Sequence, residues 1–214
     1  MTLELWLPYV LAASILLLLP GPTVLLVMGY ALSDGRGSAW RSVPGVMAGD
    51  ATAIGLSLLG LGALLATSAT LFALLKWIGA AYLIYLGVRM WRSAPQAAAL
   101  TATATDGPAP GARVGWRVFG HAYVVTALNP KSIVFFVAFL PQFIVPHAPL
   151  LPQGAVLSTT FVLLAGANAL GYALLVGTLR RTLQRPRTLR ALTRASGGVL
   201  IGAGVLTAAL RRTG

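Results

Sequence analysis

Leu19-Pro20-Gly21-Pro22 interrupts an apolar run that extends from Leu5 to Met28. A proline has no backbone N–H, and its ring clashes with the carbonyl four residues earlier, so two prolines and a glycine break a helix. Inside a bilayer no water replaces the lost hydrogen bonds, and other protein groups must satisfy the freed backbone. The stretch therefore predicts a broken membrane helix in which the carbonyls of Leu16 and Leu18 lose their usual donors.

A second break, Asn129-Pro130-Lys131, lies inside the apolar run 118–145. Pro130 is expected to free the carbonyl of Thr126 in the same way. Each break on its own is compatible with a plain packing kink, because membrane helices tolerate Pro and Gly. Two breaks in corresponding spans match the arrangement in which broken helices frame a substrate site.

The composition of the chain identifies its class. With 214 residues, 57% hydrophobic and only 9% charged, a water-soluble domain would leave too much apolar surface exposed. We therefore expect an all-α polytopic membrane protein. The net charge of +12 comes mostly from arginines that separate apolar runs, so no nucleic-acid partner is expected. The absence of cysteine excludes disulfides and thiolate ligation, and we expect no cofactor and no metal.

Six apolar runs indicate six transmembrane helices. The first lacks a basic leading region, so we interpret it as a retained span rather than a secretory signal. Five are long enough to cross a hydrocarbon core of about 30 Å, and the last needs local thinning of the bilayer. The runs are 5–28, 43–66, 71–91, 118–145, 154–179 and 195–210.

Basic residues predict the orientation of these spans. Twelve of the sixteen Lys and Arg residues fall in three connections, 29–42, 89–117 and 180–194, which lie on one side if the spans alternate. The positive-inside rule places those connections in the cytoplasm and both termini outside.

The spans divide into two sets of three. Residues 93–112 are rich in Ala, Thr, Pro and Gly and are expected to form a flexible cytoplasmic linker between 1–92 and 113–214. Because three is odd, the second set enters the membrane from the opposite face, which makes the halves an inverted repeat with broken first and fourth helices.

Polar residues inside the spans predict one layer. At about 1.5 Å per residue, Asp50 lies about 10 Å and Lys131 about 20 Å from the cytoplasmic face, and Lys131 leans toward Asp50. Asp50 is interpreted either as a functional carboxylate or as a structural ion pair, and Lys131 as its partner, a ligand for a substrate carboxylate or a neutraliser of a helix end. Similar depths are expected for Pro20, Asn129, Asn168, Tyr82 and Tyr85.

Several strings resemble the LysE/RhtB family of bacterial amino-acid exporters. The fourth-span string is the most specific, and order and spacing agree over nearly the whole chain. The matching strings are Pro20-Gly21-Pro22, Leu25-Leu26-Val27, Gly45 to Asp50, Leu75 to Gly87, Leu128-Asn129-Pro130-Lys131-Ser132, Phe135-Phe136 and Phe139-Leu140-Pro141-Gln142-Phe143.

The resemblance implies a bacterial inner-membrane exporter of amino acids or their derivatives, coupled to protons and not an enzyme. The first break departs from the family pattern: Leu19 stands where the family typically has Thr or Ser, and Thr23 where it often has Asn or Asp. We expect Asp50 to couple protons and a substrate site between the breaks, at Pro20, Gly21, Pro22, Thr23, Tyr82, Asn129, Pro130, Lys131 and Asn168.

The sequence is also compatible with other functions. The same superfamily contains heavy-metal exporters, and a polar layer also suits a non-transporting membrane scaffold that holds helices together. An intramembrane enzyme is disfavoured because the chain lacks the usual nucleophile and metal motifs. The expected partners are an amino-acid substrate and the lipid bilayer, and the oligomeric state is open between a monomer and a homodimer.

Overall fold

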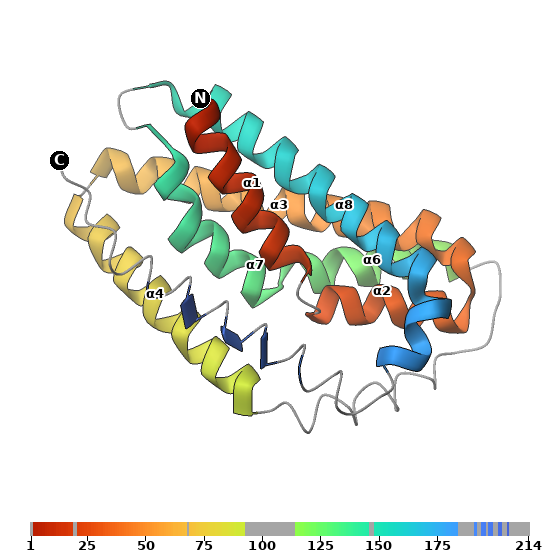
Figure 1. Cartoon of the computed structure of the whole chain (residues 1–214). Helices are drawn as coiled ribbons and strands as arrows, with labels where there is room; N and C mark the ends of the chain where they lie inside the picture. The colour runs from red at the N-terminus through yellow and green to blue at the C-terminus, as the bar shows by residue number, and fades with distance from the viewer. Residues whose placement is uncertain are drawn as a thin grey trace.

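The computed structural model is helical throughout the residues that it describes (Figure 1). These are residues 2–18, 21–67, 69–92, 114–145 and 148–183, with positions 191, 194, 195, 197, 198, 201, 202 and 205. Pro20, the predicted linker 93–112 and most of the last apolar run lie outside this set.

The first apolar run is a broken helix, as predicted from the two prolines. Helix α1 (Leu3–Leu18) and helix α2 (Pro22–Ser33) meet at an angle of 53°. Gly21 between them is extended, with φ −113° and ψ −171°, and Pro22 occupies the first turn of α2. A proline suits this position because its missing N–H has no helical acceptor there.

Two long helices form the centre of the fold. After the short 3-10 turn η1 (Arg36–Ser38), helix α3 (Ala39–Thr67) packs along helix α8 (Leu150–Leu183) (Figure 1). Among the described residues, 36–60 and 150–175 are long and apolar enough to cross a membrane, and α1 with α2 makes a third span if the bent pair counts as one. The finer prediction of six spans stays a prediction.

The second predicted break also interrupts a helix. Helix α6 (Val114–Ala127) ends before Asn129, and helix α7 (Pro130–Val134) begins with the proline. The chain then widens into the π-helix η2 (Phe135–Phe139) and tightens into the 3-10 helix η3 (Leu140–Phe143). Pro141 accounts for this change, because it has no N–H to donate and its ring displaces the carbonyl four residues earlier.

Helix α4 (Ala69–Arg92) lies at one edge of the molecule, against α7 and η2 (Figure 1). The described part of the last apolar run approaches it closely. A Cβ added to Gly87 of α4 would lie 2.5 Å from the carbonyl oxygen of Gly197. Glycine at both positions therefore permits backbone contact between these segments.

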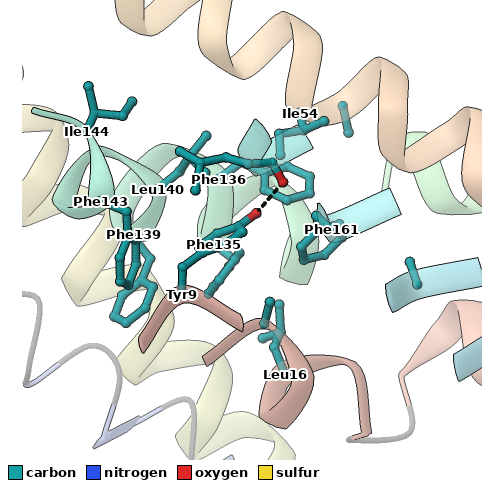
Figure 2. Close-up of a cluster of buried hydrophobic side chains, with 14 residues drawn as sticks. Tyr9, Leu16, Ile54, Phe135, Phe136, Phe139, Leu140, Phe143, Ile144 and Phe161 are labelled. Atoms are coloured by element: carbon teal, nitrogen blue, oxygen red, sulfur yellow. Dashed lines mark hydrogen bonds between the residues drawn. The ribbon is translucent and has the colours of Figure 1, made fainter. Parts of the chain in front are cut away.

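One apolar cluster joins α1, α3, α8 and the segment that follows α7 (Figure 2). Tyr9 stands at its centre, fully buried, with its ring 5.2 Å from that of Phe143. The Tyr9 hydroxyl donates a 3.0 Å hydrogen bond to the carbonyl of Leu157, so no polar atom of this phenol is left unsatisfied. The cluster fixes α1 against α8 on one side of the first break.

The opposite face of α1 carries exposed leucines and isoleucine at helical spacing. Exposed apolar side chains in a continuous stripe are unfavourable in water and suit contact with lipid chains. This stripe agrees with a membrane location and contains Leu3, Leu7, Leu11, Ile15 and Leu18.

Candidate functional site

The end of α1 exposes three consecutive carbonyls, and each one accepts a hydrogen bond from a side chain of another helix. The donors lie on α7 and α8, and we call this set of three side chains the carbonyl clamp. The bonds run from Lys131 Nζ to Leu16 (3.0 Å), from Asn168 Nδ2 to Leu17 (2.9 Å) and from the Tyr172 hydroxyl to Leu18 (2.7 Å).

The clamp satisfies the backbone groups that the break frees. The sequence predicted lost helical donors at Leu16 and Leu18, and both carbonyls take side-chain donors. The carbonyl of Leu17 was not predicted. Its helical donor would be the N–H of Gly21, and the extended conformation of that residue removes the N–H from the helix.

The second break behaves differently at one position. Pro130 was expected to free the carbonyl of Thr126, but this carbonyl accepts a 3.1 Å hydrogen bond from the N–H of Asn129. The usual donor at position 130 is absent, as predicted, but the carbonyl is not left without a partner because the chain tightens into a turn before the proline. The Asn129 side chain then caps α7 by accepting a 3.1 Å hydrogen bond from the N–H of Lys131.

The two breaks contact each other through Thr23. Its hydroxyl oxygen accepts hydrogen bonds from Asn129 Nδ2 at 3.2 Å and from the Thr126 hydroxyl at 3.3 Å. Thr23 lies in the first turn of α2, directly after the first break, and Asn129 forms the second break. A polar joint therefore links the interrupted parts of two helices that are about a hundred residues apart in the sequence.

A cavity of about 20 Å³ lies where these groups meet. This volume holds about one water molecule, and an amino acid needs several times more space. Its walls combine both apolar clusters of the protein with polar groups from both breaks. The lining residues are Leu17, Gly21, Thr23, Val24, Val46, Asp50, Asn129, Lys131, Ser132, Ala165, Asn168 and Ala169.

Among the described residues that line this cavity, Asp50 is the only acidic one. Its side chain is 2% exposed, its oxygen Oδ1 is buried without a hydrogen-bond partner, and the Ser132 side chain hydrogen-bonds to the carboxylate. The charges of Asp50 and Lys131 interact across the cavity. A buried carboxylate oxygen with no donor is costly, so this atom marks a position where a cationic or proton-bearing group is favoured.

Close helix packing positions Asp50. Gly49, the preceding residue, leaves room for α6: an added Cβ would lie 2.7 Å from the carbonyl oxygen of Tyr123 and 2.8 Å from Cβ of Thr126. Gly45, one turn earlier, would meet the carbonyl oxygen of Phe119 at 2.5 Å. This small-residue surface lets α3 approach the end of α6, and it brings Asp50 to the second break.

The structure brings together six of the predicted site residues; of the others, Pro20 lies outside the described residues, and Pro22, Pro130 and Tyr82 do not line the cavity. Pro22 and Pro130 are exposed and set the breaks from outside the cavity. Tyr82 on α4 is half-buried and packs against Tyr85, with ring centroids 6.0 Å apart. The residues that line the cavity are Gly21, Thr23, Asp50, Asn129, Lys131 and Asn168.

Two residues of the site were missed in the sequence. Ser132 follows Lys131 directly, and its proximity to the break was a usable signal. Tyr172 lies one helical turn after Asn168, so the two residues share a face of α8. This spacing was a usable signal that Tyr172 belongs to the site.

Comparisons with known proteins place the chain in a family. A model described as LysE type translocator matches residues 14–210. The homoserine/homoserine lactone efflux protein of Salmonella typhimurium is 36% identical over 99% of both chains. An uncharacterized membrane protein of Vibrio cholerae is 37% identical over 97% of this chain and 98% of its own. No solved structure matches the chain significantly. The chain therefore belongs to the LysE type translocator family, and it is a polytopic membrane transporter rather than an enzyme.

Proposed function

We propose that this protein exports amino acids and small amino-acid derivatives from the cytoplasm in exchange for protons. The observation that carries the proposal is the pairing, in one buried cavity, of a carboxylate with an unpartnered oxygen and a lysine ammonium at a helix break. Charged residues inside membrane spans are costly and mark transport pathways. The relatives named as homoserine and homoserine lactone efflux proteins support this class of substrate.

The cavity offers complementary groups for both ends of an amino acid. Asp50 Oδ1, which has no hydrogen-bond partner, is an acceptor for the ammonium group of the substrate. The first turn of α2, which begins beside Gly21, carries the partial positive charge of a helix N-terminus and favours a carboxylate. Lys131 adds a full positive charge for the same carboxylate.

Transport requires the cavity to open, because about 20 Å³ is too small for an amino acid. We place the moving contacts at the two breaks, where Thr23 meets Asn129 and Lys131 meets Leu16. These contacts are hydrogen bonds between interrupted helices, which exchange partners more readily than a packed apolar core. Proton exchange then occurs at Asp50, which takes up a proton after the substrate leaves and releases it when a new ammonium binds.

We propose for the protein the topology that its sequence predicts. Six spans form two inverted halves, 1–92 and 113–214, in the bacterial inner membrane, with both termini outside and the basic connections in the cytoplasm. In support, both described breaks precede a helix that begins with proline, Pro22 in the first half and Pro130 in the second.

The proposal is tested with purified protein in liposomes loaded with radiolabelled L-homoserine. Lowering the external pH by one unit is expected to accelerate efflux, and a protonophore is expected to abolish the acceleration. Asp50→Asn should reduce gradient-driven efflux by more than tenfold. Asp34→Asn is the matched control, because Asp34 is exposed at the end of α2 and does not line the cavity.

Two results would contradict the proposal. Equal efflux with and without the pH gradient would show that export is not coupled to protons. The transport function itself would be excluded, and a scaffold role favoured, if liposomes that hold folded protein showed no flux of homoserine, its lactone or other amino acids.

A further inference from the structure

The Lys131 ammonium occupies a position that is built for a primary ammonium group. Nζ donates a 3.0 Å hydrogen bond to the freed carbonyl of Leu16 and interacts electrostatically with Asp50. Gly21 provides the space, since a Cβ at this residue would lie 3.2 Å from Nζ. A backbone carbonyl, a carboxylate and a missing side chain thus surround this ammonium, and we call the position the ammonium subsite.

The α-ammonium of an amino acid has the same chemistry as the Lys131 side-chain terminus. Both are primary ammonium groups with three N–H donors and one positive charge. A substrate ammonium therefore gains the same interactions in the ammonium subsite as Lys131 does. The buried oxygen Oδ1 of Asp50, which has no partner, adds an acceptor for a substrate.

We propose that Lys131 is a tethered substitute for the substrate: its ammonium holds the ammonium subsite at Leu16 and Asp50, and the ammonium of a bound substrate displaces it. This inference rests on the proposed function and names the chemistry of the site as recognition of primary amines. Displacement keeps one ammonium beside Asp50 whenever this buried carboxyl group is ionised, which avoids the cost of an isolated charge in the membrane.

The displaced lysine then determines which amines bind well. An amino acid brings a carboxylate along with its ammonium, and the released Lys131 pairs with that carboxylate. An amine without a carboxylate, such as homoserine lactone or an alkylammonium ion, displaces the lysine and offers its ammonium group no new partner. Lys131 therefore favours amino acids over simple amines through the cost of leaving its charge buried and unpaired.

The test uses an alkylammonium that reproduces the deleted side chain. Lys131→Ala removes Cγ, Cδ, Cε and Nζ, which together correspond to n-propylammonium. Binding to purified protein is followed through the thermal unfolding midpoint, which rises when a ligand binds the folded state. We expect n-propylammonium to bind Lys131→Ala at least tenfold more tightly than wild type, in competition with L-homoserine.

Two controls make the binding specific. Neutral n-propanol, of the same shape, should not stabilise Lys131→Ala, and the double variant Asp50→Asn/Lys131→Ala should lose the response to n-propylammonium. If Lys131→Ala does not fold, Lys131→Leu keeps the side chain as far as the Cδ position, and methylammonium, which corresponds to Cε and Nζ, replaces n-propylammonium as the probe.

The outcomes separate this inference from the proposed function. If wild type exports homoserine but neither lysine variant binds its alkylammonium probe more tightly than wild type, the inference is overturned and the exporter stands. If the probe binds and homoserine does not compete with it, the substrate does not use the ammonium subsite and the inference is also overturned. If the probe binds in competition with homoserine but wild type moves no amino acid, the subsite is upheld and the transport proposal fails.

Discussion

Asn168 donates a 2.9 Å hydrogen bond to the carbonyl of Leu17, although 151 residues separate the two in the sequence. Leu17 belongs to the last turn of α1, where the helix supplies no donor, and Asn168 lies in the middle of α8. One turn further along α8, Tyr172 does the same for Leu18. The end of α1 is thus stable because α8 supplies donors to the carbonyls of Leu17 and Leu18, whose helical donors are lost at the extended Gly21 and at Pro22.

This relationship predicts a loss of stability when a donor of the clamp is removed. Asn168→Leu leaves the carbonyl of Leu17 without a partner, and we expect the free energy of unfolding to fall by about 1–3 kcal/mol. Tyr172→Phe should cost about 1 kcal/mol, because Tyr172 is more exposed and water or lipid headgroups offer partial replacement. Thermal unfolding of purified protein in detergent measures both.

A matched control for the clamp is Thr160→Ala. Thr160 also lies on α8 and accepts a 3.1 Å hydrogen bond from the indole of Trp6, away from the break. We expect this variant to keep transport at the wild-type rate. If Asn168→Leu also transports and unfolds like wild type, the clamp does not support the break.

The sequence allowed the breaks and the main polar residues to be predicted, because proline and intramembrane charge have direct physical consequences. Asp50 and Lys131 both line the cavity that the depth arithmetic anticipated. The hydrogen-bond partner of Lys131 could not be predicted, since it is the backbone carbonyl of Leu16. Every residue carries such a carbonyl, so a backbone acceptor leaves no signature in the side-chain sequence.

Other contacts depend on how helices pack after they form. The bond from Asn129 to Thr23 requires the starts of α2 and α7 to meet, and no local pattern specifies that meeting. The sequence did not predict the replacement donor at Thr126, for a related reason. Its carbonyl accepts from Asn129 within a tight turn, and a proline-based rule for a continuous helix does not describe a turn.

The close contact between α3 and α6 makes a prediction about Gly49. Gly49→Ala places a Cβ 2.7 Å from the carbonyl oxygen of Tyr123, which no real Cβ tolerates, so the helices must separate. We expect a loss of about 1–3 kcal/mol in unfolding free energy, together with slower transport as Asp50 moves away from Ser132. Gly55→Ala on the same helix meets no atom within 4 Å and should be neutral or stabilising by up to about 1 kcal/mol. Equal unfolding midpoints for the two variants would contradict this packing.

Gly21 is expected to affect transport more than stability. Its φ of −113° is accessible to any residue, so Gly21→Ala introduces no backbone strain. The new Cβ would meet the end of the flexible Lys131 side chain at 3.2 Å, and it would intrude on the cavity. We expect the unfolding free energy to change by less than about 0.5 kcal/mol, whereas KM for homoserine rises several-fold. Gly29→Ala, on the same helix with no atom within 4 Å, should leave KM unchanged.

Gln153 anchors the connection between η3 and α8, away from the cavity. Its side-chain oxygen accepts a 2.8 Å hydrogen bond from the N–H of Val145, and its amide nitrogen donates to the carbonyls of Val145, Ala148 and Pro149 at 3.1–3.2 Å. The residue is 3% exposed, so Gln153→Leu leaves buried backbone groups unsatisfied. We expect the unfolding free energy to fall by about 2–3 kcal/mol and the connection to be cut faster by an added protease. Leu151→Ala, at an 85% exposed position two residues earlier, should change neither measurement, and a protease rate for Gln153→Leu equal to that of this control would show that the amide does not hold the connection.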